Sequence, residues 1–367
     1  MNTKTHNGDP ESSSPDGGDT GLSVTGLSHA YGARSVLRDI NLGIAPGEIL
    51  CLLGPSGCGK TTTLRLIAGL EQLQSGRIAW NEDVLADGGG SVPPEHRHVS
   101  LLFQDFALFP HLTVAENVAF GLTELSSEER DARVHQVLDQ VGMLRYATTY
   151  PHFLSGGEQQ RIALARARAP RPRIFLLDEP FSNLDTRLRN QLRDLCLHIL
   201  KKSNSSSVIV THDAEEAMFM GDKVAVMREG EIVQVGPPEE LYFQPNSAFV
   251  AGLFGEVNEI RGRVVEGHVV TPIGKLCAPD MTEGAEVDVL VRPEALKVSE
   301  SMDGPSVASV ITSRLLGRSS LLHLSVPNGE PGGLHLHSRV PGRVLPEEGT
   351  TVGISLDEQN VFVFPVE

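Results

Sequence analysis

The chain has 367 residues, of which 40% are hydrophobic and 21% are charged, and it carries a formal net charge of −16 at pH 7. This length suits two domains of roughly 100–200 residues, and the acidic balance argues against a general nucleic-acid binder, which needs a basic face. The longest apolar stretches, such as residues 49–53 and 174–177, are strand-sized and fall short of the ~20 residues that a membrane-crossing helix needs.

Residues 1–20 are rich in Ser, Gly, Asp and Pro without periodicity, which predicts a disordered tail. The N-terminus lacks a basic region followed by an apolar core, so we see no secretory signal and expect the chain to stay inside the cell. Four dispersed cysteines without a CxxC pair agree with a reducing compartment. We therefore predict three segments: the tail (1–20), an α/β domain (21–245) and a β-rich domain (246–367).

Short apolar strands alternate with helical segments from residue 22 to about residue 234, which predicts a mostly parallel sheet covered by helices. Ser126 and Glu129 form a capping box, and Gly142 ends the helix that the box begins. Asp213 and Glu216 predict a similar box. The apolar stripe of the first helix is Val134, Val137, Leu138 and Val141.

A glycine-rich segment that matches G-x-x-x-x-G-K-[ST] lies between a strand and a helix. Glycines let backbone N–H groups curl around phosphate oxygens, and the helix N-terminus adds its positive dipole. Lys60 is expected to reach the β- and γ-phosphates of ATP, and the Thr61 hydroxyl to bind Mg²⁺. The nucleotide-binding residues are Gly54, Pro55, Ser56, Gly57, Cys58, Gly59, Lys60, Thr61 and Thr62. Cys58 is read either as a small residue that fits the loop or as a reactive thiol.

A second Ser/Gly segment, Ser155-Gly156-Gly157, precedes another helix. A hydroxyl, glycine amides and a helix N-terminus make a second anion site. One nucleotide does not need two such phosphate-binding sites in one subunit. We therefore expect residues 155–157 to close over the nucleotide that a second copy of the chain holds. The alternative is an ordinary helix start.

A buried strand, residues 174–177, ends in two carboxylates. Asp178 is placed to hold Mg²⁺ through water, and Glu179 to orient and polarise the attacking water. His212 follows a further strand and is expected to face the γ-phosphate, whereas the other histidines are read as solvated or buried in the core.

The sequence pattern changes after residue 255. Apolar and other residues alternate in short runs that are separated by Gly, Pro and Asn, such as residues 261–265, 287–291 and 361–364. This pattern predicts a small all-β region of barrel type. His335 and His337 alternate with leucines on one strand, and we interpret them as a solvated β face without a transition metal.

The order of these motifs, with Tyr31, Gln104 and residues 182–185 in their places, resembles the ATPase subunits of ABC transporters over about residues 20–250. The resemblance implies that Tyr31 stacks on adenine, that Gln104 contacts Mg²⁺ and the attacking water, and that Asp185 crosses a homodimer interface. Its catalytic residues would be Glu179, His212, Gln104 and Lys60. Two residues depart from the family pattern: Glu158 stands where Gln is usual, and Arg168 replaces a small or aliphatic residue.

Residues 236–242 and 291–294 resemble the tail of binding-protein-dependent importers of sugar, polyamine, sulfate and ferric ion, which carry a small OB-like regulatory domain. Residues 103–114, 254–256 and the Phe-rich ending favour ferric-ion import, with polyamine, sulfate or sugar import as the alternative. The resemblance implies two permease subunits, an indirect link to a substrate-binding protein, no nucleic acid, and a peripheral position on the cytoplasmic membrane face. Two rivals remain: a soluble ABC ATPase acting on nucleic acid or ribosomes, and a chain whose β region chiefly regulates.

Overall fold

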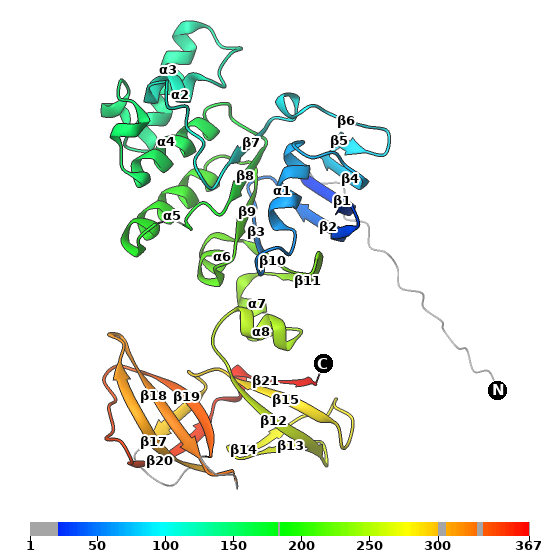
Figure 1. The fold of residues 1–367 in the computed structure, drawn as a ribbon, viewed down its shortest axis with the longest axis vertical. Coiled ribbons are helices and arrows are strands. Elements are labelled where there is room, and N and C mark those ends of the chain that lie inside the picture. Colours follow the sequence, from blue (N-terminus) through cyan, green and yellow to red (C-terminus); the bar gives the residue numbers. More distant parts are fainter. Residues whose placement is uncertain (1–20, 183, 300–305, 329–332, 367) are drawn as a thin grey trace, which may run out of the picture. The chain divides into compact units, whose positions relative to one another are not determined.

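The computed structural model describes residues 21–182, 184–299, 306–328 and 333–366; the predicted tail and Asn183 lie outside this part (Figure 1). Two compact units interleave along the sequence. The first comprises Met1–Leu50, Gly57–Val210 and Glu229–Glu231, and the second comprises Cys51–Ser56, Thr211–Arg228 and Ile232–Glu367, each within the described residues.

The first five-stranded sheet is antiparallel, with the order β2-β1-β4-β5-β6. The mostly parallel sheet predicted from residue 22 onward is therefore wrong for this segment. The reason lies in the connections, because β1 and β2 are joined by only two residues and a parallel pair needs a much longer crossover. The strands are β1 (Leu22–Tyr31), β2 (Arg34–Ile44), β4 (Ser75–Trp80), β5 (Asp83–Asp87) and β6 (Gly90–Ser91).

The second sheet follows the predicted parallel pattern. Strands β7, β8 and β9 run parallel, with Leu102 opposite Leu177 and Asp178 opposite Val210. Ile174, Phe175, Leu176 and Leu177 are fully buried, which explains their uninterrupted apolar run. The six strands of this sheet are β3 (Ile49–Leu53), β7 (Val99–Leu102), β8 (Ile174–Asp178), β9 (Ser206–Thr211), β10 (Lys223–Arg228) and β11 (Glu231–Gly236).

The helices confirm one capping box and modify the other. Ser126 caps α3 with both arms of the box present, and Gly142, at φ +70°, follows its C-cap. At α6, Asp213 accepts from the Glu216 N–H, but the Glu216 carboxylate accepts from the Thr211 hydroxyl. The helices are α1 (Lys60–Ala68), α2 (Val114–Ala119), α3 (Ser127–Gln140), α4 (Gly156–Arg168), α5 (Thr186–Lys201), α6 (Ala214–Met220), α7 (Pro238–Phe243) and α8 (Ala248–Leu253); single turns of 3₁₀-helix are η1 (Pro94–His96), η2 (Leu144–Tyr146), η3 (Pro151–Phe153) and η4 (Glu358–Asn360).

The region after α8 is all-β, as predicted, and consists of two five-stranded antiparallel sheets. One has the order β14-β13-β12-β15-β21 and the other β16-β20-β17-β18-β19. The terminal strands of the second sheet approach each other, since Ser338 Oγ of β19 donates to Leu296 O of β16, so the sheet nearly closes into a barrel. The strands are β12 (Asn258–Val265), β13 (His268–Thr271), β14 (Gly274–Cys277), β15 (Glu286–Val291), β16 (Leu296–Ser299), β17 (Ser306–Leu315), β18 (Ser319–Val326), β19 (Leu334–Pro341), β20 (Thr351–Leu356) and β21 (Val361–Pro365).

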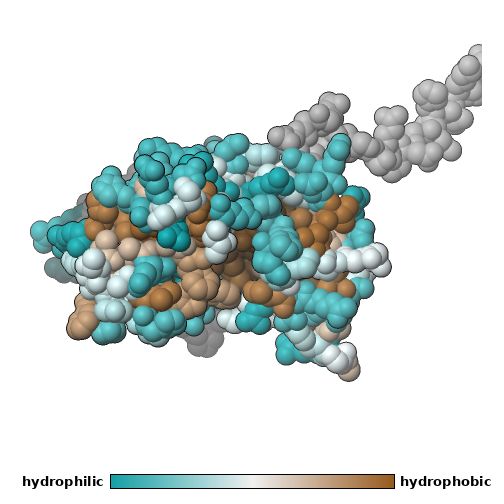
Figure 2. Space-filling view, turned by 90° about the horizontal axis from the view of Figure 1, so that it is seen from above, coloured by the Kyte–Doolittle hydropathy of each residue, from teal (hydrophilic) through white to brown (hydrophobic). Residues whose placement is uncertain are grey.

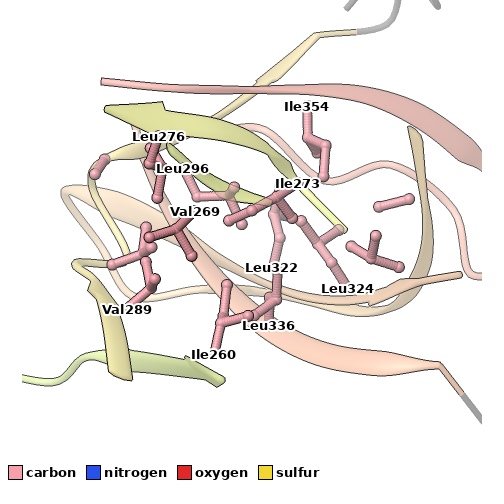
Figure 3. Close-up of a cluster of buried hydrophobic side chains, with 14 of the residues drawn as sticks. Ile260, Val269, Ile273, Leu276, Val289, Leu296, Leu322, Leu324, Leu336 and Ile354 are labelled. Carbon is pink, nitrogen blue, oxygen red and sulfur yellow. The ribbon is translucent and has the colours of Figure 1, made fainter. Parts of the chain in front are cut away.

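One apolar core joins these two sheets (Figure 3). Ile260 and Val289 come from the first sheet, and Leu322, Leu336 and Ile354 come from the second. Alternate residues such as Leu322, Leu324 and Val326 of β18 enter this core, so the residues between them lie on the outer face.

Candidate functional site

The glycine-rich segment joins β3 to α1 in a conformation that only glycine adopts easily. Gly57 and Gly59 have φ of +81° and +106°, in the left-handed region. A Cβ on Gly59 would lie 2.4 Å from Leu37 Cδ2 and 2.9 Å from Val36 O of β2, so the close approach of β2 also requires glycine. The loop therefore has the tight, backbone-exposing shape that its motif predicts.

The side chains of the loop differ sharply in burial. Lys60 and Cys58 are only 5% and 3% exposed, and Lys60 Nζ lies 3.8 Å from Cys58 Sγ. Gly54 and Gly59 are also buried, Thr61 and Thr62 are half-buried, and Pro55, Ser56 and Gly57 are exposed. The apex of the loop thus remains accessible, whereas its lysine is held within the protein.

The structure brings the start of α1 to the end of β8. Thr61 Oγ1 donates to Asp178 Oδ1 at 3.1 Å. Burial raises the pKa of Asp178, and the hydrogen bond from Thr61 partly opposes this shift. A hydroxyl and a half-buried carboxylate are hard oxygen ligands, so this pair fits a Mg²⁺ ion, whose charge would offset the desolvation of the carboxylate.

Glu179 occupies a strained turn directly after this strand. Its φ is +45°, which costs a non-glycine residue about 1 kcal/mol or more. The turn is held because the Glu179 N–H donates to Val210 O at 3.0 Å and Ser182 Oγ donates to Glu179 O at 3.1 Å. Gln104 Nε2 in turn donates to Ser182 Oγ at 3.3 Å. Two predicted catalytic residues, Gln104 and Glu179, thus share one corner.

The second Ser/Gly segment caps α4, as predicted, but its hydroxyl is engaged. Ser155 Oγ donates to Glu158 Oε2 at 2.7 Å, and the Ser155 N–H donates to the same oxygen at 3.0 Å. These hydrogen bonds hold the pKa of Glu158 below its usual range. Glu158, which stands where Gln is usual in the family, therefore places a negative charge next to the Ser155 hydroxyl that was predicted to bind an anion.

The two glycines of this segment differ. A Cβ on Gly157 would lie 2.5 Å from Leu188 Cδ2 of α5, whereas a Cβ on Gly156 would meet nothing within 4 Å. Gly157 is thus required for packing and Gly156 is not. Asp185 caps α5 by accepting from the N–H groups of Arg187 and Leu188.

The two remaining predicted residues lie at the ends of strands. Tyr31, at the end of β1, is 46% exposed, and its hydroxyl donates to Glu71 Oε1 at 3.2 Å. The β2 strand that pairs with it also supplies the contacts to Gly59. His212 is exposed between β9 and α6.

Sequence reasoning missed the role of Arg166 in α4. Its guanidinium donates to the carbonyls of Ala107 at 2.7 Å and Phe106 at 3.0 Å, two residues with positive φ that follow Gln104. It also lies 5.3 Å from the centre of the Phe109 ring. Arg166 therefore ties the helix of the second Ser/Gly segment to the segment after Gln104. An arginine in a helix carries no local signal for this contact, because its partners lie about sixty residues away.

A cavity of about 900 Å³ lies elsewhere in the first unit, lined by residues of η1, α3 and the turn after α4 such as Glu95, Arg133 and Pro170. None of the predicted site residues lines it. None of the described helices combines the length and the apolar character that a membrane-crossing segment requires.

Comparison with known proteins agrees with this geometry. A family model described as "ABC transporter" matches residues 37–182, and one described as "TOBE domain" matches residues 289–364. The spermidine/putrescine import ATP-binding proteins PotA of Escherichia coli (strain K12) and Shigella boydii serotype 4 are each 44% identical over 294 residues, covering 77% of this chain and 76% of theirs.

Among solved structures, CbiO1 of Clostridium perfringens, part of the ABC transporter complex CbiONQ, is similar with a TM-score of 0.57 and 29% identity, covering 61% of this chain and 91% of that one. The similarity to importer subunits supports the importer type, while the ferric-ion interpretation finds no support among these relatives. The chain therefore belongs to the ABC transporter family, as an ATPase domain followed by a TOBE domain.

Proposed function

We propose that this chain is the ATPase subunit of an importer for polyamines of the spermidine and putrescine class. The support is the 44% identity to PotA proteins over three quarters of the chain. Polyamine import was the alternative to ferric-ion import in the sequence analysis, and it replaces ferric ion as the preferred cargo.

The observation that carries the ATPase assignment is the Thr61–Asp178 hydrogen bond next to the strained Glu179 turn. Thr61 and Asp178, with Gln104, would hold Mg²⁺, which when bound neutralises charge on the phosphates. Glu179 polarises the attacking water as a general base.

The other predicted residues act on the nucleotide. Lys60 and His212 stabilise charge on the transferring phosphoryl group, and Tyr31 stacks on adenine. The backbone N–H groups of residues 54–61 bind the phosphates of ATP. These roles follow the family motif, and the buried Lys60 and the exposed apex of the loop agree with them.

We further propose that two copies complete each other's sites. Ser155 and Gly157 of one chain contact Glu158 and Leu188, and neither of these contacts involves Thr61 or Asp178. Residues 155–157 and Asp185 would face the nucleotide of the partner copy, with the open Gly156 nearest to it.

Exposed aromatic side chains offer a surface for two permease subunits. Phe120 and Phe153 are 58% and 73% exposed, and Phe120 lies against Phe109, 4.4 Å between ring centres. Figure 2 views the end where α2 and α3 lie in Figure 1 and shows apolar patches among hydrophilic residues. Exposed apolar patches of this kind mark protein interfaces. The chain would thus sit peripherally on the cytoplasmic membrane face, linked only indirectly to a substrate-binding protein.

Uptake in a strain that lacks this chain tests the cargo. We expect labelled spermidine and putrescine uptake to be lost and to return with the wild-type chain but not with Thr61→Val, while ferric-ion uptake is unchanged. Loss of ferric, sulfate or sugar uptake instead would overturn the polyamine assignment. ATP hydrolysis that is stimulated by nucleic acid or ribosomes, and not by a permease, would favour the soluble rival.

A further inference from the structure

Three histidines share the outer face of two neighbouring strands in the TOBE region. Leu322, Leu324 and Leu336 are at most 1% exposed and point into the core (Figure 3). Strand side chains alternate between faces, so His323 of β18 and both histidines of β19, His335 and His337, lie on the opposite face. His323 stands directly opposite His337 in the antiparallel register.

The imidazoles converge. Their ring centres lie 4.4 Å apart for His323 and His337, 5.4 Å for His323 and His335, and 5.1 Å for His335 and His337. One ring nitrogen from each lies within 4.8 Å of the other two. A tetrahedral zinc ion bound at about 2.0–2.1 Å needs ligand nitrogens about 3.4 Å apart, so the imidazoles would have to turn about their side-chain bonds to come this close.

A polar partner stands beside the cluster. Thr312 of β17 is the cross-strand neighbour of His323, and its Oγ1 is buried without a hydrogen-bond partner. Metal-binding histidines usually donate their second ring N–H to a nearby acceptor. The orphaned Thr312 hydroxyl can accept that hydrogen bond from His323.

Two arginines lie on strands β17 and β19 of the same sheet. Arg314 on β17 contributes positive charge near His323, and Arg339 on β19 is paired with Glu256 at 3.6 Å. A metal ion binds each imidazole through the lone pair of a ring nitrogen.

The backbone of the cluster is held before any ligand binds. Asn258 Oδ1 accepts from the His337 N–H at 2.6 Å, and Asn258 Nδ2 donates to His337 O at 2.8 Å. Asn258 is 7% exposed and belongs to β12 of the neighbouring sheet. His337 is therefore fixed in place by a buried amide.

We propose that His323, His335 and His337 form a binding site for one divalent first-row transition-metal ion of the Zn²⁺ type. Three imidazoles supply the protein ligands, and the fourth position faces solvent, since His335 is exposed. This proposal replaces the expectation that His335 and His337 are merely a solvated face, which was made without His323. It is independent of the transported cargo.

The test uses the full-length chain, stripped of metal with a chelator and titrated with Zn²⁺ or Co²⁺ in a calorimeter and by Co²⁺ absorption spectroscopy. We expect one ion per chain at this site. His323→Ala, His335→Ala and His337→Ala should each weaken binding by more than about 10-fold, and Thr312→Val by about 10-fold. His268→Ala, an exposed histidine of β13, is the matched control and should bind as the wild type does.

The triple variant His323→Ala/His335→Ala/His337→Ala decides the matter once its metal-free thermal unfolding matches that of the wild type. If this folded variant binds Zn²⁺ as tightly as the wild type, the ion lies elsewhere and the proposal fails. It also fails if the Co²⁺ spectrum of the wild type is that of the hydrated ion. If the triple variant unfolds at a lower temperature than the wild type, the single variants and Thr312→Val are used instead. The proposal then fails if these folded variants bind Zn²⁺ as tightly as the wild type.

Discussion

The polar side chains of the two candidate sites lie at different places in their secondary-structure elements. In the ATPase domain these groups lie where an element begins or ends: Thr61 lies in the first turn of α1, Asp178 closes β8 and Ser155 caps α4. In the TOBE region His323 and His337 lie in the middle of strands, and register alone makes them neighbours. Local chain geometry places each residue at its element end, whereas strand pairing decides which residues become neighbours on a sheet face.

Glu179→Gln is the sharpest test of a site at the end of a strand. Removing the general base should lower ATP turnover by about 100- to 10,000-fold and let an ATP-bound dimer accumulate, measured by phosphate release and size-exclusion chromatography. Glu128→Gln, an exposed residue of α3, is the control. A Glu179→Gln chain that stays monomeric in ATP and hydrolyses at the normal rate would contradict both the general-base role of Glu179 and the proposed sharing of sites between two copies.

Asn258→Ala probes the pairing on which the TOBE region depends. The variant loses the hydrogen bonds to Val291 O and to both backbone groups of His337. Leaving buried groups unpaired should lower the free energy of unfolding by about 2–4 kcal/mol, measured by urea denaturation. His268→Ala on the exposed face of β13 should change it little, and equal stabilities of the two variants would mean that the amide bridge is unimportant.

Gly157→Ala and Gly156→Ala separate packing from function at one helix start. The added methyl of Gly157→Ala meets Leu188, so we expect a loss of about 1–3 kcal/mol in the free energy of unfolding. Gly156→Ala has room and should unfold like the wild type, yet hydrolyse ATP more slowly if Gly156 faces the nucleotide of the partner copy. Normal ATP turnover by Gly156→Ala would argue against a nucleotide-binding role for residues 155–157.

Arg166→Met tests the contact that sequence reasoning missed. It removes two hydrogen bonds from the charged guanidinium to the carbonyls of Phe106 and Ala107, each worth about 1.5–3 kcal/mol net. We expect stimulation of ATP hydrolysis by the permease to fall by up to about 10-fold while the chain remains folded. Arg168→Met, at the end of the same helix, is the control, and an equal loss in both variants would assign the effect to the helix as a whole.

Glu158→Gln has the smallest expected effect on stability, at most about 0.5 kcal/mol at pH 7, because an amide oxygen still accepts from Ser155. The folded-state pKa of Glu158 is lowered, so its contribution is present at neutral pH and is lost as pH falls through that value. Glu158→Gln should remove this pH-dependent part of the stability, and Glu129→Gln should do the same in the capping box of α3. Only Glu158→Gln should change ATP turnover, since only its box holds the predicted anion-binding hydroxyl.

The sequence by itself determined the elements whose signals are local. The capping box at Ser126, the phosphate loop and the buried strand before Asp178 all follow from residues within one or two turns of the chain. The all-β character of the last third was likewise readable from alternating apolar residues. These features were predicted because propensity, capping and turn chemistry act between near neighbours.

Only the tertiary structure decided which distant residues meet. It revealed the antiparallel first sheet, the hydrogen bond from Arg166 to Ala107 O, and the position of His323 beside His337. Register and helix packing set these contacts, and a shift of one residue along a strand would move His323 to the other face. Such neighbours are chosen by the global packing of apolar faces, which no local window of the sequence contains.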